Sequence, residues 1–139
     1  MSAALNLLDL PSSKRSPLAL AEQVERGLPI SALDRLINAI TPDDPTFANR
    51  LVPRATLARR RARHEARLTN EESARVVRIG EIWEFAMKVW QDAEKARQWL
   101  FRPHMMLDDR CPIDVVIASE YGKPVVDGML GRLYYGTGV

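Results

Sequence analysis

Residues 92–136, DAEKARQWLFRPHMMLDDRCPIDVVIASEYGKPVVDGMLGRLYYG, decide the fold of this chain, because apolar residues and prolines recur through them at regular intervals. Asp92 is predicted to cap a short helix, and Pro103 then forces the backbone out of helical geometry. Pro112 favours the start of a second short helix, since a proline in the first turn loses no hydrogen bond. We therefore predict a compact helical module over residues 92–139.

The last helix of this module is predicted to reach about Tyr134. Ser119 is one candidate for its cap, and Pro124 is a candidate either for its true start or for a kink. Between the two preceding helices, Asp108 and Asp109 predict a turn. The three tryptophans Trp83, Trp90 and Trp99 are best interpreted as hydrophobic core.

The segment before this module has the pattern of one long helix. Thr69 with Glu72 fits a capping box, and the helical period then continues to Trp90. Two apolar stripes run along it, one of Val76, Ile79, Trp83, Ala86 and Trp90 and one of Ile82, Phe85 and Val89. About twenty residues give about 30 Å of helix, so this segment can connect the two halves of the chain.

The first half is also helical in pattern. Ser16 and Pro17 predict a helix start, with Gly27 as its stop and Leu20 and Val24 on its inner face. A second helix opens at Pro29 and carries Leu33, Leu36, Ile37 and Ile40 at helical spacing. The chain is thus predicted to be all-α: a flexible arm (1–15), a helical region (16–68), a connecting helix (69–91) and the C-terminal module (92–139).

Two short helices, at about 45–51 and 54–64, give the outline of a helix-turn-helix. The second of them is rich in arginine. Helical periodicity predicts one basic stripe of Arg59, Arg60, Arg63 and Arg67, and a separate packing side of Ala55, Ala58 and Ala62. Arg61 falls on the packing side beside Leu57, so the second helix either ends near there or lets the long Arg61 side chain lie along the surface. The predicted DNA contacts are Arg54, Thr56, Arg59, Arg60, Arg63 and Arg67, although a solvated basic face would have the same composition, and Thr56 could equally cap the helix.

Composition narrows the functional classes. The 139 residues are 46% hydrophobic with a net charge of +2, and residues 50–78 alone hold nine basic and three acidic groups. Such a basic block attracts a phosphate backbone. No stretch has the length of a membrane span or the pattern of a signal peptide, so a cytoplasmic protein is expected. The single cysteine, Cys111, is interpreted as a buried structural thiol.

Catalysis and metal binding are not indicated by the sequence. His104, Asp108 and Asp109 lie close together, but no Ser, Cys or Lys nucleophile is paired with them and no glycine-rich phosphate loop exists. A surface turn accounts for the two adjacent aspartates. We therefore expect no enzyme activity, no metal and no cofactor.

Several motifs occur together in the C-terminal half. They are Trp99-Leu100-x-x-Pro103, Arg110-x-Pro112-Ile113-Asp114, Ser119-Glu120-x-Gly122, Val126-x-x-x-Leu130-Gly131-Arg132 and Tyr135-Gly136. Upstream stand Pro53-x-x-Thr56-Leu57-Ala58-Arg59-Arg60 and Leu68-Thr69-x-Glu71-Glu72-Ser73. Over about residues 27–136 the chain resembles the antitoxins of the Xre/MbcA/ParS family. It departs from that pattern where Leu51-Val52-Pro53 lacks a turn glycine, at His104, where the family often has Asn, and at Asp108 and Asp109, where it often has Gly.

The resemblance implies an antitoxin of a type II system whose RES-domain toxin consumes NAD or transfers ADP-ribose from it. It further implies that the C-terminal module covers the entrance of the toxin's active site and that the complex binds its own operator DNA. The expected toxin-binding residues are Arg102, Pro103, His104, Arg132, Tyr134, Tyr135, Gly136 and Val139, although Tyr134 or Tyr135 could instead seal the core. A homodimer or a toxin–antitoxin hetero-oligomer is expected, with no membrane partner. The alternative is a stand-alone helix-turn-helix transcription regulator.

Overall fold

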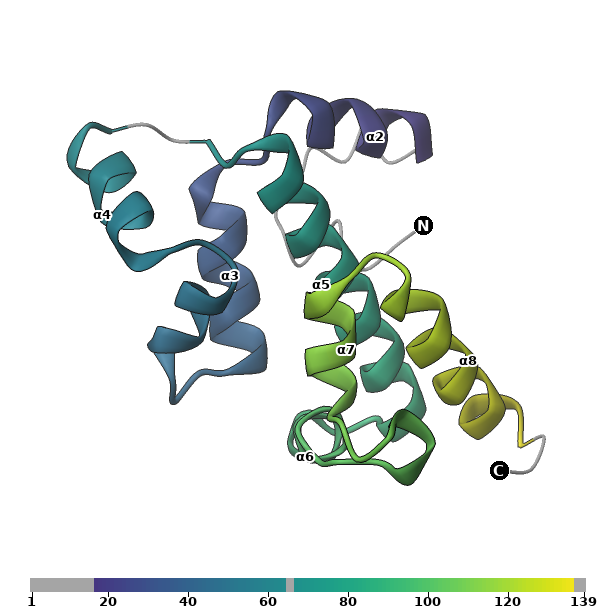
Figure 1. Cartoon of the computed structure of the whole chain (residues 1–139). Helices are drawn as coiled ribbons and strands as arrows, with labels where there is room; N and C mark the ends of the chain where they lie inside the picture. The colour runs from purple at the N-terminus through teal and green to yellow at the C-terminus, as the bar shows by residue number, and fades with distance from the viewer. Residues whose placement is uncertain (1–16, 65–66, 137–139) are drawn as a thin grey trace. The chain divides into compact units, whose positions relative to one another are not determined.

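The computed structural model describes residues 17–64 and 67–136, and this part of the chain is helical throughout (Figure 1). The predicted all-α class is confirmed, because the only β-structure in these ranges is two isolated bridges. The elements are α2 (Pro17–Arg26), α3 (Ile30–Ile40), η2 (Pro45–Arg50), α4 (Arg54–Ala62), α5 (Asn70–Trp90), α6 (Ala93–Leu100), η3 (Met105–Leu107), α7 (Pro112–Ala118) and α8 (Gly122–Tyr135). The predicted arm at 1–15, the cap at Ser16 and the tail residue Val139 lie outside the described ranges.

The chain forms two compact units, and their boundary falls inside α5, between Gly80 and Glu81. No helix in the described ranges has the length and apolar character needed to cross a membrane. Each unit has its own set of buried apolar residues.

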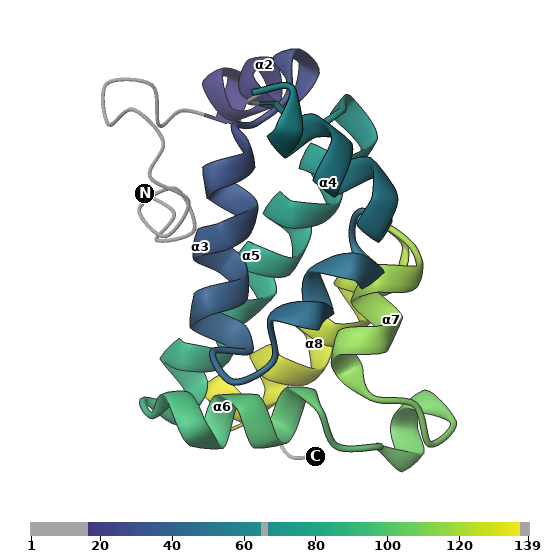
Figure 2. The ribbon, with the colours of Figure 1, turned by 90° about the vertical axis from the view of Figure 1, so that its left-hand side faces the viewer.

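In the first unit α3 supplies much of the core. Its residues Leu33, Leu36, Ile37 and Ile40 are buried, as their spacing predicted. The preceding helix α2 has the predicted bounds but no fully buried residue, so Leu20 and Val24 are only partly covered. Figure 2 shows how the chain leaves α3, turns through η2 and enters α4. Since η2 is a 3-10 helix that packs on α3, the predicted short helix is present but more tightly wound.

A backbone clamp fastens the start of α3 to the start of α5. The Leu68 N–H donates to the Leu28 carbonyl oxygen at 2.7 Å, and the Leu28 N–H donates to the Ser73 Oγ at 2.8 Å. Gly27 lies beside this clamp with a φ of +89°, and a Cβ on it would lie 2.1 Å from the Leu68 carbonyl oxygen. Only glycine fits there, and its left-handed backbone stops α2 at the preceding residue, Arg26.

The capping box of α5 is confirmed. The Thr69 N–H donates to the Glu72 Oε1 at 2.8 Å, and the Glu72 N–H donates to the Thr69 Oγ1 at 3.1 Å. These two bonds satisfy backbone donors that the first helical turn leaves unpaired.

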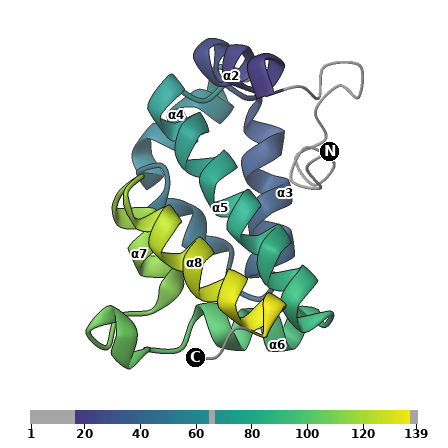
Figure 3. The same ribbon diagram turned by 90° about the vertical axis from the view of Figure 1, so that its right-hand side faces the viewer.

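The second unit contains the rest of α5 together with α6, α7 and α8. The Asp92 carboxylate accepts the Lys95 N–H at 3.0 Å, which confirms the predicted cap of α6. Helices α7 and α8 pack against each other and are seen side by side in Figure 3. Ile113 and Val116 of α7 and Val126 and Leu130 of α8 are all buried.

The start of α8 settles the two alternatives left open by the sequence. The helix begins at Gly122, so Pro124 lies in its first turn and neither starts nor kinks it. Ser119 is not the cap; its Oγ accepts the Tyr121 N–H at 3.0 Å in the turn before the helix. At Gly122 the start of α8 lies close against α7, because a Cβ on this residue would lie 2.1 Å from the Val115 carbonyl oxygen.

Candidate functional site

Most of the residues predicted to contact DNA lie on α4 or at its C-cap. The helix ends at Ala62 and not at His64, and its buried residue is Leu57. Ala55, Ala58 and Ala62 are exposed. The predicted alanine packing side is therefore wrong: on so short a helix the single leucine fixes which side faces inward, and small side chains contribute little to that choice.

Arg60 does not join the predicted basic stripe. Its guanidinium binds both carboxylate oxygens of Glu72, with one contact to Oε1 and another to Oε2 at 3.2 Å. The two side chains are only 11% and 12% exposed. Because Glu72 also forms the capping box, this ion pair joins α4 to the first turn of α5, and Arg60 is a structural residue of the first unit.

Arg67 is also separated from the stripe. It lies beyond the end of α4, and its Nη1 donates to the Gly27 carbonyl oxygen at 2.6 Å. Thr56 is half-buried. The predicted DNA contacts that remain exposed on α4 and its C-cap are Arg54, Arg59 and Arg63.

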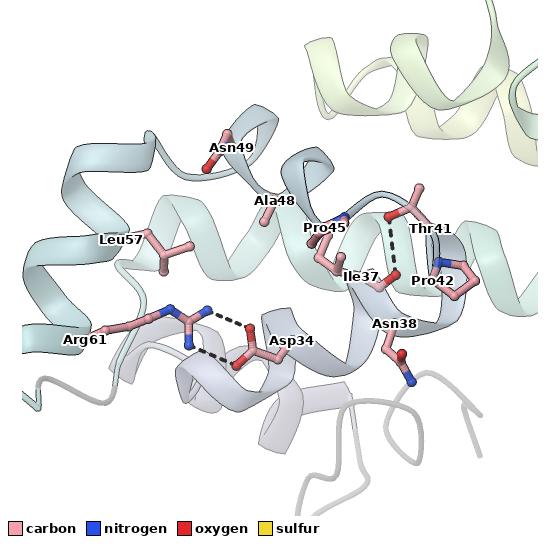
Figure 4. A pocket seen from close by; sticks show the side chains of 10 residues that line it. All are labelled: Asp34, Ile37, Asn38, Thr41, Pro42, Pro45, Ala48, Asn49, Leu57 and Arg61. Atoms are coloured by element: carbon pink, nitrogen blue, oxygen red, sulfur yellow. Dashed lines mark hydrogen bonds and ion pairs between the residues drawn. The ribbon is translucent and has the colours of Figure 1, made fainter.

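The sequence missed Arg61, which is exposed and binds Asp34 of α3 (Figure 4). Its Nη2 lies 2.6 Å from Oδ1 and its Nη1 lies 3.2 Å from Oδ2. The hydrogen bonds that the Arg61 guanidinium donates to Asp34 raise the pKa of Arg61 above its usual value, so this group stays charged. Both residues line a cavity of about 310 Å³ beside Ile37 and Leu57. Sequence spacing alone gives no signal for this pair.

The Arg60–Glu72 pair leads to a prediction on stability against pH. Burial alone would raise the pKa of Glu72, but the hydrogen bonds from Arg60 and Thr69 outweigh it and lower the pKa below 4.5. A lowered folded-state pKa means that the carboxylate stabilises the fold above that value and that this contribution is lost as acid protonates it. Glu72→Gln keeps a capping-box residue but loses the charge, so we expect it to cost about 1.5–3 kcal/mol at neutral pH.

Urea unfolding measured from neutral pH into the acid range checks this expectation. The difference between the parent protein and Glu72→Gln should shrink below pH 4.5. Glu71→Gln is the matched control, because it removes a carboxylate from the same helical turn. The Glu71 side chain is 86% exposed, and its oxygen lies 3.7 Å from the Arg75 guanidinium, which is too far for a hydrogen bond. A difference that stays constant with pH would contradict the assignment.

In the second unit the predicted toxin-binding loop is divided between exposed and inward-facing residues. Arg102 and Pro103 are exposed. His104 is turned inward, with Nε2 3.2 Å from the Trp99 carbonyl oxygen and its ring 5.0 Å from the Trp99 ring. This geometry makes His104 a brace for the loop.

The loop turns back at Asp108 and Asp109, as predicted, and both have the left-handed backbone that such a turn requires, with φ of 54° and 63°. Met105 and Met106 stand out of the same loop at 88% and 56% exposure, and nothing in the sequence pattern marked them. The Cys111 thiol is half-buried, less covered than predicted, and donates to the Phe101 carbonyl oxygen at 3.3 Å.

The end of α8 gathers aromatic residues. Tyr135 is 73% exposed and meets the Tyr134 ring edge-on at 5.0 Å. Tyr134 is less exposed, because the Phe85 ring lies 6.3 Å away and the Lys88 Nζ lies 5.0 Å from its centroid. Gly136 caps the helix with a φ of +65° and donates its N–H to the Arg132 carbonyl oxygen; the Arg132 side chain is half-buried. Trp83 and Trp99 are buried and Trp90 is half-buried, consistent with the predicted core role.

Tyr135 also lines a cavity of about 270 Å³ together with Glu81, Phe85, Lys88 and Lys123. Burial raises the pKa of Glu81, and the positive charge of Lys123 partly opposes that rise. Across residues 17–64 and 67–136, no cluster of His, Cys, Asp and Glu has the arrangement of a metal site.

The α4 surface and the aromatic end of α8 both lie in segments of the chain that match models of known families. A model of the antitoxin Xre-like helix-turn-helix domain matches residues 19–80, and a model of the antitoxin Xre/MbcA/ParS C-terminal toxin-binding domain matches residues 86–136. The chain is also similar to Antitoxin Xre of Yersinia enterocolitica serotype O:8 / biotype 1B, with 29% identity over 132 residues that cover 94% of this chain and 86% of that protein. The first match contains α4, and the second contains the aromatic end of α8.

Proposed function

Because the chain belongs to the Xre/MbcA/ParS antitoxin family and is an antitoxin with a helix-turn-helix DNA-binding domain, we propose that its partner is a RES-domain toxin that consumes NAD or transfers ADP-ribose from it. The chain inhibits this enzyme by covering the entrance of its active site. We assign DNA binding to residues 16–68, the connection to 69–91 and toxin binding to 92–139. Because operator DNA is one of its ligands, the antitoxin acts in the cytoplasm.

The toxin-binding assignment is supported above all by the exposed aromatic end of α8 within the matched toxin-binding domain. Tyrosine and arginine are the residue types that most often anchor interfaces, and Tyr135 presents most of its side chain to solvent. Arg132 and Gly136 belong to the same end of the helix. Arg102 and Pro103 are exposed in the loop and are assigned to the toxin contact as well, and His104 contributes by holding that loop in shape.

Coexpression with the neighbouring reading frame tests this proposal. The neighbour alone should stop growth and deplete cellular NAD, and this chain should restore both and copurify with it. A neighbour that is toxic without any change in NAD or in ADP-ribosylated protein would overturn the RES assignment. Persistent toxicity in the presence of this chain would overturn inhibition.

We assign operator binding to α4 through Arg54, Arg59 and Arg63, with Thr56 near the helix start. Because helix-turn-helix proteins usually read two half-sites, the binding form is a two-fold pair, either a homodimer or an assembly with the toxin. The complex thereby represses its own operon.

Arg59→Ala is expected to weaken DNA binding on every sequence and to reduce the salt slope by about one, because one phosphate contact is lost. Fluorescence anisotropy over a range of salt concentrations measures this slope. Arg26→Ala is the matched control, since it removes one exposed arginine from the end of α2 and none from α4. Equal slopes for the two variants would contradict a role for Arg59 on the phosphate backbone.

A further inference from the structure

We infer that Arg61 is a phosphate contact of the DNA surface and that Asp34 is its positioning residue. This inference rests on the proposed role of α4 in DNA binding. It adds to that surface one arginine that helical periodicity had assigned to the packing side and one carboxylate that no basic stripe would include.

The geometry of the pair leaves Arg61 able to bind a second acceptor. Asp34 takes one N–H from each terminal nitrogen, at 3.2 Å from Nη1 and 2.6 Å from Nη2. A guanidinium has five N–H donors in a planar fork, so the Nε edge remains available for a second, side-on acceptor. The Arg61 side chain is 46% exposed, which leaves that edge within reach of solvent and of a phosphate oxygen.

Asp34 also fixes where the guanidinium lies. Figure 4 shows the pair bridging from α3 to α4, at the edge of the cavity of about 310 Å³ that Leu57 and Ile37 line. Because the space beside the pair is open, apolar neighbours cover the long Arg61 side chain only in part. The planar fork-to-carboxylate contact holds the guanidinium in place.

A carboxylate on a DNA-binding surface lowers attraction to any phosphate backbone, since like charges repel. Asp34 is therefore expected to trade some sequence-independent affinity for orientation. With Asp34 present, Arg61 meets a phosphate only in the correct docking geometry. Without Asp34, Arg61 can contact the nearest phosphate in any geometry, and the protein discriminates less between its selected sequence and other DNA.

The test uses the full chain with two duplexes, one selected by the chain from a randomised pool and one with that sequence scrambled. Arg61→Ala should reduce the salt slope by about one on both duplexes. Asp34→Ala should leave the slope unchanged, bind the scrambled duplex as tightly or more tightly, and lower the ratio between the duplexes by about threefold to tenfold. Arg61→Lys should keep the slope but lower the ratio, because it keeps the charge and loses the fork.

Asp43→Ala is the matched control, because it removes an exposed carboxylate from the turn after α3. It should strengthen binding to both duplexes by the same factor and leave the ratio of the two affinities unchanged. If Asp34→Ala and Arg61→Ala each weaken binding to the two duplexes by the same factor, the ion pair only fastens α3 to α4, and the inference is overturned. An Arg61→Ala slope equal to that of the parent also overturns it, while Arg59→Ala then still tests DNA binding by α4. A parent protein that binds neither duplex removes the proposed function itself.

Discussion

Gly122→Ala is expected to disrupt the packing of α7 on α8 and with it the capture of toxin. A Cβ at this position would lie 2.1 Å from the Val115 carbonyl oxygen and 2.9 Å from the Val115 Cγ1. Most of that clash is with backbone, so no change of rotamer relieves it and the two helices must separate. Overpacking of this kind costs about 3 kcal/mol or more. Urea unfolding and toxin pull-down measure the two effects.

Gly131→Ala provides the control within the same helix. Gly131 lies inside α8, and apart from its chain neighbours and the nearby backbone of that helix, no atom lies within 4 Å of the Cβ that alanine would add. Alanine there should stabilise the protein by about 0.5–1 kcal/mol and leave toxin capture intact. If Gly122→Ala unfolds at the same urea concentration as Gly131→Ala, the close approach of α8 to α7 is not what holds this unit together.

Helix starts could be predicted from the sequence because their causes are local. The Asp92 cap, the Thr69–Glu72 capping box and Pro112 each act within about one helical turn, and the structure has all three. Long apolar periods were also reliable. The four apolar positions of α3 are buried because a continuous stripe on an eleven-residue helix leaves one choice of inner face.

Which side of α4 faces inward could not be predicted in this way. The helix has nine residues and one buried apolar side chain, so its period is too short to orient it. Its orientation depends on partners from other elements: Glu72 on α5 takes Arg60, and Asp34 on α3 takes Arg61. Those contacts span 12 and 27 residues of sequence, and arginine is compatible with either side of a helix.

The same reason explains why the residues of the predicted toxin-binding loop differ in exposure. Local signals placed Pro103 and the aspartate turn correctly in an exposed loop. The inward turn of His104 depends on the Trp99 carbonyl group and ring, which only the folded α6 brings into position. A histidine beside a proline in a loop is equally compatible with both orientations, so its role as a brace emerges from tertiary structure alone.

Tyr135→Ala is expected to cause the largest loss of toxin affinity among single substitutions that leave the fold intact. The side chain is 73% exposed, so its removal costs the free protein little, and its ring is held edge-on against Tyr134. A rigid exposed aromatic residue of this kind can contribute about 2–4 kcal/mol at an interface, which is a loss of about 30-fold to 1000-fold. Isothermal titration calorimetry with a catalytically inactive toxin measures it.

Two further tyrosine variants decide whether the end of α8 is the site of contact. Tyr121 directly precedes the first residue of α8 and is similarly exposed, at 79%. Tyr121→Ala should therefore change toxin affinity little. Tyr135→Phe should retain most of the affinity if the ring supplies the buried area, and should lose it if the hydroxyl group bonds to the toxin. If Tyr121→Ala weakens binding and Tyr135→Ala does not, the toxin engages the opposite end of α8, and inhibition must then depend on the turn at Ser119 and not on the aromatic end.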